Sequence, residues 1–393
     1  MTTPVPDRPG PADGPVYLDY NATTPVDPRV VAAMLPYLTT CFGNPSSSHA
    51  YGADPAAALV TARAQLAALI GARPQEVVFT GSGSEANLLA LRGATVRTPG
   101  AHIITQATEH PAVMQSCQAL ARLHGVRVTV LPVGADGRLD PATLAAALRD
   151  SGATLVSVMA ANNETGVLQP IRELAALAHH HGALFHCDAA QAAGKIALDV
   201  AALDVDLLTV VGHKMYAPKG IGALYVRTGV ELEPVVYGGG QEHGLRAGTE
   251  NVALTAAFGA AATLAADDLA RNAPARIARL RDQLHQQLSA ALPGRVHLNG
   301  HPDHRLPNTL NVSIDGTRGH ELLTLATDIA ASTGSACHSG THTPSPVLGA
   351  MRLDTARALS ALRLSLGRWT TPDDIEKAVT ALVAAVTATQ APS

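Results

Sequence analysis

A lysine and an aspartate each follow an apolar stretch that predicts a β-strand. Lys214 stands three residues after the run Leu207 to Val211, and Asp188 directly follows the run Leu184 to Cys187. An amine beside a carboxylate is what pyridoxal phosphate chemistry requires, because the amine forms a Schiff base and the anion pairs with the ring nitrogen. The sequence therefore offers the two central groups of such a site.

A cysteine lies in a run of small and polar residues, Gly334-Ser335-Ala336-Cys337, which is typical of a loop. A thiol in such a loop is exposed and free to react. A cofactor that withdraws electrons and a reactive thiol in the same chain together indicate sulfur chemistry.

Each of these residues also has a plainer interpretation. Most lysines are solvated, so Lys214 could be an ordinary loop residue, and Asp188 could cap a helix. Free cysteines are often buried, so Cys337 could be a structural thiol. His110, in the run Thr108-Glu109-His110-Pro111, could cap a helix or could lie over an aromatic cofactor as an acid and base.

The composition limits the class of protein. The 393 residues suffice for one large and one smaller packed unit. Hydrophobic residues make up 47%, charged residues 15%, and the formal net charge is -4, which predicts neither nucleic-acid binding nor a membrane surface as partner. The four cysteines show no paired short spacing, which argues against a zinc ribbon and a disulfide-rich secreted domain. A reducing cytoplasm fits best.

Three segments could be mistaken for other features. Residues 1–15 are rich in Pro, Gly and Asp and read as a flexible tail, not as a signal peptide. The apolar segment Val252 to Ala266 is shorter than the roughly 20 residues that span a bilayer, so we expect a buried helix. The triplet His179-His180-His181 precedes Gly182, which favours a helix end over a metal site.

Short apolar runs alternate with helical patterns from Glu76 to Val226. Such strands, apolar on both faces, predict a mostly parallel sheet covered by helices on both sides. Helices are expected at Glu85 to Gly93 and at Ile171 to His181. The predicted strands are Val77 to Thr80, His102 to Thr105, Val126 to Leu131, Leu155 to Met159, Leu184 to Cys187, Leu207 to Val211 and Ala223 to Val226.

Ligands of such sheets bind where the strands end. The run Gly81-Ser82-Gly83-Ser84 follows a strand and precedes a helix, so its backbone N–H groups and hydroxyls could hold a phosphate. Gly/Ser turns before helices are common, and no Gly-Lys-Ser/Thr follows as a mononucleotide loop would require.

A second unit is predicted to begin near Asp267 with an amphipathic helix from Leu269 to Leu292. Its other expected elements are strands at Thr309 to Ile314 and Leu362 to Ser365 and a final helix from Pro372 to Val386. The predicted division is thus a tail of residues 1–15, a large domain of residues 16–266 and a small α/β domain of residues 267–393. The first residues of the large domain could pack with the small one.

Several motifs stand in order along almost the whole chain, between Tyr17 and Thr371. They are Tyr17 to Pro25, Phe42 to Ser47, Thr108-Glu109-His110, Asn162 to Gly166, Gly212-His213-Lys214, Gly238 to Glu242, Arg246 to Asn251 and Gly334 to Cys337. Together they closely resemble the cysteine desulfurase and selenocysteine lyase family, which belongs to the class V aminotransferases and has the fold-type I of pyridoxal phosphate enzymes.

The resemblance implies a role for particular residues. Lys214 would form the Schiff base, Asp188 would bind the pyridine nitrogen, and Gln191 would bind the phenolate oxygen. His110 would stack on the ring and move protons, while Asn163 and Arg363 would hold the substrate carboxylate. The groups implied for the phosphate are Ser84, the backbone of Gly83, His213 and, from the second subunit of a homodimer, Thr249.

The implied reaction converts L-cysteine to L-alanine and leaves a persulfide on Cys337, from which a partner protein takes the sulfur. Its destination stays open among iron–sulfur clusters, modified tRNA, thio-cofactors and secondary metabolites. Val211 replaces a serine of many desulfurases and removes a phosphate donor, a feature shared with selenocysteine lyases. Selenocysteine lyase is therefore the alternative activity. A non-catalytic scaffold for sulfur-transfer partners is a third possibility, disfavoured because the expected catalytic residues are all present.

Overall fold

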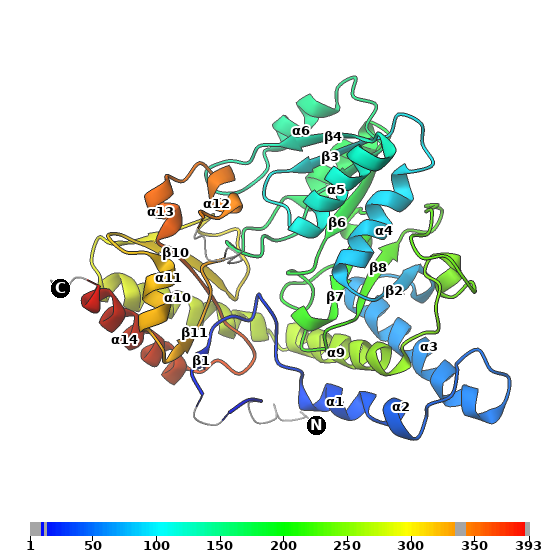
Figure 1. Ribbon diagram of the computed structural model, residues 1–393, viewed down its shortest axis with the longest axis horizontal. Helices are drawn as coiled ribbons and strands as arrows, with labels where there is room; N and C mark the ends of the chain where they lie inside the picture. The colour runs from blue at the N-terminus through cyan, green and yellow to red at the C-terminus, as the bar shows by residue number, and fades with distance from the viewer. Residues whose placement is uncertain (1–8, 12–13, 335–342, 390–393) are drawn as a thin grey trace.

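A seven-stranded sheet forms the centre of the larger part of the molecule (Figure 1). The computed structural model describes residues 9–11, 14–334 and 343–389. The strand order is β2-β8-β7-β6-β5-β3-β4, and only β8 runs antiparallel to its neighbours. The strands are β2 (Val77–Thr80), β3 (His102–Gln106), β4 (Arg127–Leu131), β5 (Leu155–Ser157), β6 (Leu184–Asp188), β7 (Leu207–Val211) and β8 (Gly222–Val226).

The mostly parallel α/β architecture predicted from the sequence is confirmed, and each predicted strand is present with small shifts at its ends. One expectation is wrong: β4 is not apolar and buried on both faces, since Arg127 and Val130 are exposed. The reason is its position at the edge of the sheet, where one side meets solvent.

Helices cover both faces of this sheet, as the strand pattern requires. Alternate strand residues such as Val78 and Ile103 pack against helices α4 (Gly83–Thr95) and α5 (Pro111–His124). Residues of the opposite parity, such as Phe79 and Ile104, belong to a larger core. The helices of that second face are α3 (Ala50–Ile70), α6 (Pro141–Leu148), α7 (Ile171–His180) and α9 (Val252–Ala270).

Helix α9 is the one described helix that is long and apolar enough to cross a membrane by length and composition, and half of its most apolar stretch is buried inside the protein. It packs closely along α3, because a Cβ atom at Gly259 would lie 2.6 Å from the Cα atom of Ala62. The predicted start of the next helix, at Leu269, is wrong. Helix α9 continues to Ala270, and α10 (Ala273–Ala291) begins after Asn272. Asn272 adopts a left-handed conformation, which asparagine tolerates, and this ends the first helix.

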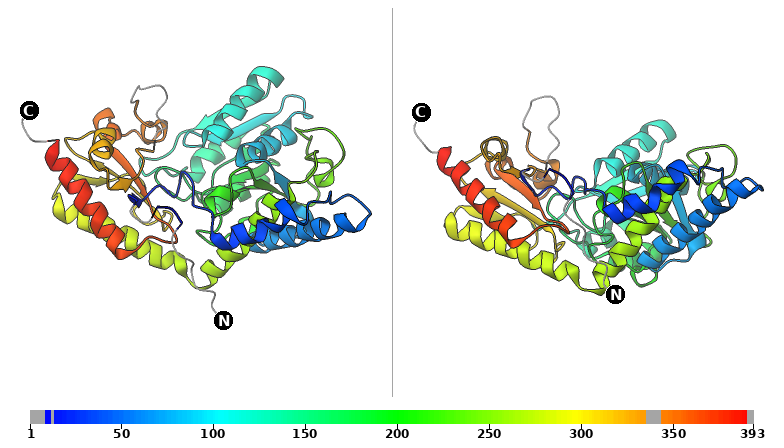
Figure 2. Two further views of the ribbon diagram at one scale, coloured as in Figure 1. Left: turned by 60° about the horizontal axis from the view of Figure 1, so that its bottom comes forward. Right: turned by 90° about the horizontal axis from the view of Figure 1, so that it is seen from below.

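The smaller part of the molecule combines the C-terminal elements with the N-terminal strand (Figure 2). One sheet has the antiparallel order β12-β10-β9, and β1 pairs in parallel with β11. Val16 and Leu18 of the N-terminal segment share a core with residues of α10 and β10. The strands here are β1 (Val16–Tyr17), β9 (Val296–Leu298), β10 (Thr309–Ile314), β11 (Ile329–Ala330) and β12 (Ala361–Ser365).

Shorter helices complete the two parts. The remaining helices are α1 (Pro28–Met34), α2 (Pro36–Thr39), α8 (Val200–Leu203), α11 (Gly319–Leu325), α12 (Pro346–Ala350), α13 (Thr355–Leu359) and α14 (Pro372–Ala388).

At the end of α7, His179 hydrogen-bonds the carboxylates of Asp204 and Asp206, at 3.1 and 2.7 Å.

Arg368 ties the smaller part to the larger one. Its guanidinium donates to Asp27 at 2.5 Å and to Asp268 at 2.7 Å, and it lies 4.1 Å from the ring centre of Tyr216. Asp27 is fully buried and also accepts hydrogen bonds from Arg29. A buried carboxylate is costly without its cations, so this cluster holds the two parts in one arrangement.

Replacing Arg368 with methionine should lower the free energy of unfolding by about 3 kcal/mol, because Asp27 would remain buried with one cation fewer. Urea unfolding followed by circular dichroism measures the change. The matched control is Arg271→Met, which breaks an exposed helical ion pair with Asp267 and should cost less than about 0.5 kcal/mol. Equal losses in the two variants would contradict a structural role for the Arg368 cluster.

Candidate active site

A cavity of about 620 Å³ lies where the strands of the large sheet end, and the smaller part of the molecule closes its far side. Its size lies within the range of small-molecule sites. The large sheet contributes residues that follow β2, β3, β6 and β7, and the smaller part contributes residues near β11 and β12. Among the residues with predicted roles, the cavity is lined by Gly83, Ser84, His110, Asn163, Asp188, Gln191, His213, Lys214 and Arg363.

The Lys214 amine faces this cavity and donates hydrogen bonds to the backbone carbonyls of Asn21, at 2.6 Å, and Ala22, at 2.7 Å. Burial, followed by the positive charge of Arg363, lowers the pKa of Lys214 to about 8, although Asp19 and Asp188 oppose the shift. A much larger fraction of the amine is therefore neutral near pH 8 than for a solvated lysine. A neutral amine can act as a nucleophile or accept a proton.

The Asp188 carboxylate is held rigidly at the end of β6. Its Oδ2 accepts a hydrogen bond from the side chain of Asn87 at 2.7 Å, and its Oδ1 accepts one from the backbone N–H of Ala190 at 2.9 Å. The side chain is almost entirely buried and lines the cavity. A fixed, buried anion at this position suits a cationic ring nitrogen.

The start of α4 offers donors to an anion. This helix begins at Gly83, two residues earlier than predicted, so Gly83 and Ser84 lie in its first turn, whose N–H groups have no partner within the helix. A Cβ atom at Gly83 would meet Val211 at 2.4 Å, so only glycine lets the helix start lie this close to β7. Nearby, burial and the charges of Lys214 and Lys219 lower the pKa of His213 to about 4. A helix start among cations suits a phosphate.

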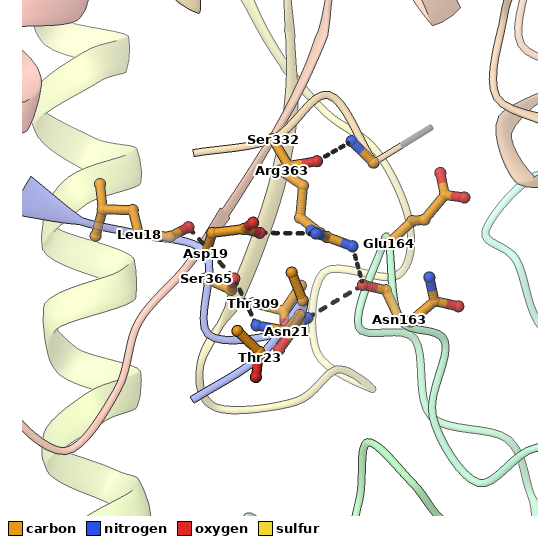
Figure 3. Close-up of polar contacts among 12 residues, drawn as sticks. Leu18, Asp19, Asn21, Thr23, Asn163, Glu164, Thr309, Ser332, Arg363 and Ser365 are labelled. Atoms are coloured by element: carbon orange, nitrogen blue, oxygen red, sulfur yellow. Dashed lines mark hydrogen bonds and ion pairs between the residues drawn. The ribbon is translucent and has the colours of Figure 1, made fainter. Parts of the chain in front are cut away.

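The guanidinium of Arg363 enters the cavity from β12 (Figure 3). Its Nη1 donates to the backbone carbonyl of Asn163 at 3.2 Å, and its Nη2 donates to Asp19 at 2.7 Å. Its Nε is buried and, within the described part of the chain, has no hydrogen-bond partner. A buried N–H without a partner is costly, and a planar anion such as a carboxylate would satisfy it.

His110 both caps a helix and lines the cavity. Its Nδ1 accepts a hydrogen bond from the backbone N–H of Ala112 at 3.1 Å, at the start of α5. Burial lowers the pKa of His110, Lys214 lowers it further, and Asp188 opposes this. The ring is therefore neutral at physiological pH with its proton on Nε2, since Nδ1 acts as an acceptor.

Comparison with known proteins shows the family to which this chain belongs. The chain matches the family model described as aminotransferase class-V over residues 16–378. It is 47% identical over 371 residues to the cysteine desulfurase IscS of Anaeromyxobacter dehalogenans (strain 2CP-C), covering 93% of this chain and 91% of that protein. The chain belongs to the cysteine desulfurase group of the class-V aminotransferase family. The family resemblance found in the sequence is confirmed.

Solved structures agree with this membership in fold. A protein described as NifS-like has a TM-score of 0.88 and 33% sequence identity, covering 95% of this chain and 99% of that one. A structure described as SspA in complex with cysteine has a TM-score of 0.78 and 34% identity, covering 90% of this chain and 99% of that one. The fold-type I architecture is thereby confirmed.

Two residues with predicted roles are not among the described residues that line the cavity. Thr249 is exposed on the loop before α9 and is not among the residues that line the cavity of its own chain. Cys337 lies outside the described residues. Among the other cysteines, burial raises the pKa of Cys117 to about 12 and also raises the pKa of Cys187, so neither thiol is poised to react.

No role was predicted from the sequence for Asn21, which lines the cavity, or for Lys195, which does not line it but bonds Gln191 of the cavity wall. Asn21 accepts hydrogen bonds through its backbone carbonyl from Gln191, at 2.9 Å, and from Lys214. Lys195 donates to the Oε1 of Gln191 at 2.7 Å and to the Oδ1 of Asn21 at 3.1 Å. These two bonds fix the amide of Gln191 with its Oε1 toward Lys195 and its Nε2 toward the carbonyl of Asn21. The position of Lys195, four residues after Gln191, was an available signal.

Glu109 is a third residue that sequence reasoning missed. Its Oε1 accepts hydrogen bonds from the backbone N–H of Met159, at 2.6 Å, and from Gln106, at 3.0 Å, whereas its buried Oε2 has no partner in the described residues. Burial raises the pKa of Glu109 to about 8, and the charge of Asp188 adds to the shift. The folded protein therefore favours the protonated acid next to His110.

Replacing Glu109 with glutamine should stabilise the protein increasingly as the pH rises. A carboxyl group whose folded pKa is raised contributes stability below its unfolded value of 4.5, and this contribution is lost as the pH rises through about 8. The free energy of unfolding of Glu109→Gln relative to the parent should increase by about 3 kcal/mol between pH 5 and pH 8.5. The exposed Glu173→Gln is the control. A difference between Glu109→Gln and the parent that stays constant with pH would show that Glu109 is ionised in the fold.

Proposed function

We propose that the protein is a pyridoxal phosphate-dependent enzyme that removes sulfur from free L-cysteine, giving L-alanine and a persulfide on Cys337. The observation that carries the proposal is one cavity lined by the Lys214 amine, with its lowered pKa, by a fixed Asp188 carboxylate and by the Arg363 guanidinium. One N–H of this guanidinium has no partner among the residues that the structure describes. Membership of the cysteine desulfurase group supports it.

The donor set of the cavity fits pyridoxal phosphate. Lys214 would hold its aldehyde carbon, Asp188 its ring nitrogen and Gln191 its phenolate oxygen, while His110 would lie against the ring. The phosphate would be held by Gly83, Ser84 and His213, with Thr249 added by a second subunit. When bound, pyridoxal phosphate supplies an aldehyde that takes up the substrate amine and a ring that withdraws electrons from the α-carbon.

The protein's own residues bind the substrate and move its protons. Arg363 binds the carboxylate of L-cysteine through two N–H groups, and the Asn163 side chain lies on the same cavity wall. The neutral amine of Lys214 accepts the α-proton, as its lowered pKa allows. His110, whose Nδ1 already accepts a hydrogen bond from Ala112, can donate the proton on its Nε2. Asp188 stays fixed by Asn87 and Ala190 throughout.

The thiol of Cys337 accepts the sulfur. Its thiolate attacks the sulfur of the substrate, so that an S–S bond forms and the bond between sulfur and Cβ breaks. The carbon skeleton keeps the electron pair and takes up protons to become L-alanine. Gly334 lines the cavity, and Cys337 follows it by three positions in the sequence.

A second copy of the chain and a sulfur-acceptor protein are the proposed partners. Large apolar side chains gather, exposed, on the N-terminal helices and the loop between α2 and α3, and a homodimer would cover them. These residues are Leu35, Leu38, Phe42, Tyr51 and Val60. In a dimer the exposed Thr249 could reach the cavity of the other subunit. A reducing compartment such as the cytoplasm would keep the Cys337 thiol free.

One observation favours a second candidate activity, that of a selenocysteine lyase. Val211 lines the cavity beside Gly83, so it contributes an apolar surface where a serine would donate a hydrogen bond. Sulfur and selenium differ little in size, and pocket contacts separate such ligands by only about 1 to 3 kcal/mol. The distinction must then rest on the reactivity of the chalcogen and on the need for Cys337.

The purified protein should be yellow, and reduction with borohydride should fix pyridoxal phosphate to Lys214, because this amine has a lowered pKa and lines the cavity together with Asp188. Peptide mapping identifies the modified residue. Lys214→Ala should fold and release no measurable L-alanine, whereas Lys377→Ala, at an exposed helical ion pair, should behave as the parent does. An adduct on another lysine would refute this assignment.

Replacing Cys337 with alanine should separate substrate binding from sulfur transfer. The variant should bind L-cysteine with a shift in absorbance but lose at least about 100-fold in L-alanine release, because no protein nucleophile accepts the sulfur. L-Selenocysteine should keep part of its turnover, since selenium leaves more readily. The control is Cys41→Ala. If the parent protein itself does not turn over L-cysteine and is only inhibited by it, the lyase replaces the desulfurase as the proposed function.

A further inference from the structure

Asp19 forms an ion pair with the guanidinium that we assign to the substrate carboxylate. Its Oδ1 accepts a hydrogen bond from Nη2 of Arg363 at 2.7 Å (Figure 3). The Asp19 side chain is 23% exposed and lines the cavity, whereas the Arg363 side chain is 7% exposed. The pair thus lies at the cavity wall, within reach of a ligand.

The backbone around Asp19 is fixed from both sides. The residue forms a bridge with Ser365, two residues after Arg363, and the backbone N–H of Leu18 bonds the carbonyl of Ala330. Asp19 therefore cannot move away from Arg363 as a loop would, and any release of the guanidinium must occur by rotation of the side chains.

Asp19 bonds Nη2 of Arg363, the nitrogen that a bound carboxylate would need in either of its two binding geometries. A guanidinium binds a carboxylate with two hydrogen bonds either through Nη1 and Nη2 or through Nε and Nη2, so Nη2 belongs to both edges. In the structure Nη1 donates to the carbonyl of Asn163, Nη2 donates to Asp19, and the buried Nε has no partner among the described residues. An incoming carboxylate must share Nη2 with Asp19 or displace it.

The other charges near Arg363 do not remove this conflict. Burial lowers the pKa of Lys214 and of Lys195, so neither amine brings a full positive charge to this region. Asp188 and Glu164 bring carboxyl groups, but among the described residues Asp19 is the carboxylate in direct contact with the guanidinium. Two carboxylates at one guanidinium repel each other, and the repulsion persists because the site is partly buried.

We propose that Asp19 is an internal competitor of the substrate carboxylate: it occupies Arg363 in the free protein and lowers the affinity for small carboxylates, which speeds the release of L-alanine. The inference rests on the proposed function of Arg363. The substrate and the product carry the same carboxylate, so a competitor at this position weakens both and limits inhibition by the product.

The test separates the charge of Asp19 from its hydrogen bond. Asp19→Asn keeps an oxygen that can accept from Nη2 but removes the charge, and Asp19→Ala removes both. Two probes are compared by calorimetry on the purified full-length protein: 3-mercaptopropionate, which has the carboxylate but no amine, and 3-mercaptopropanamide, which has no charge. The inhibition constant of L-alanine against L-cysteine turnover is measured in parallel.

With Asp19→Asn, 3-mercaptopropionate should bind about ten-fold more tightly and L-alanine should inhibit at about ten-fold lower concentration, while binding of the amide stays within about two-fold. With Asp19→Ala, 3-mercaptopropionate should also bind more tightly than it binds the parent, because the competing carboxylate is gone. This variant tests the idea even if Asp19→Asn fails to fold. Unchanged or weaker binding of 3-mercaptopropionate in these variants would overturn the inference and show that Asp19 only orients Arg363.

Arg363→Met distinguishes this failure from a failure of the proposed function. If Arg363 binds the carboxylate, the variant should lose the preference for 3-mercaptopropionate over the amide. A loss in Arg363→Met together with no tightening in Asp19→Asn would reject the competitor and keep the substrate site. A preference that survives in Arg363→Met would reject the site itself, and the inference about Asp19 with it.

Discussion

The buried side chain and backbone of Asn21 join several of the segments that build the cavity. Asn21 lies in the N-terminal segment, yet it bonds residues of the large sheet on one side and of the smaller part of the molecule on the other. Its hydrogen-bond partners are Asn163, Gln191, Lys195, Lys214, Asn308, Thr309 and Ser365. A buried amide must satisfy all of its polar atoms, and these partners can satisfy them in only one relative placement of the two parts.

That requirement explains why the cavity has fixed walls although it lies between two separately packed cores. The Arg368 cluster holds the outer edge of the same junction through Asp27 and Asp268. Inside the junction, the Lys214 amine is held by two backbone carbonyls of the N-terminal segment. The lowered pKa of Lys214 thus depends on the closed arrangement, because burial by both parts is its main cause.

The sequence predicts well the cavity residues at the strand ends of the large sheet. It predicts poorly those that come from the smaller part of the molecule and the N-terminal segment. Lys214 and Asp188 follow strands that proved to be neighbours in the sheet, so the rule that sites form at strand ends brings them together from pattern alone. Arg363 reaches the cavity through the pairing of β12 with β10, a contact that no local pattern specifies, and only the family resemblance pointed to it.

Asp19 and Asn21 stood within a recognised motif, but no pattern in the sequence indicated their partners. The partner of Asp19 lies more than 300 residues away, and those of Asn21 lie on several segments. The exposed face of β4 and the break at Asn272 were missed for a different reason, since edge position and a single left-handed residue are properties of tertiary structure.

The pairing of β1 with β11 has a consequence for synthesis on the ribosome. Val16 pairs with Ile329, so the first strand to be made waits for more than 300 further residues before its partner exists. During that interval the apolar Val16 and Leu18, which end in the core of the smaller part, have no native surface to cover them. The nascent large sheet can fold earlier, but Arg363, which enters the cavity from β12, is made only when translation is nearly complete. The order of translation therefore delays completion of the cavity until the chain is almost free of the ribosome.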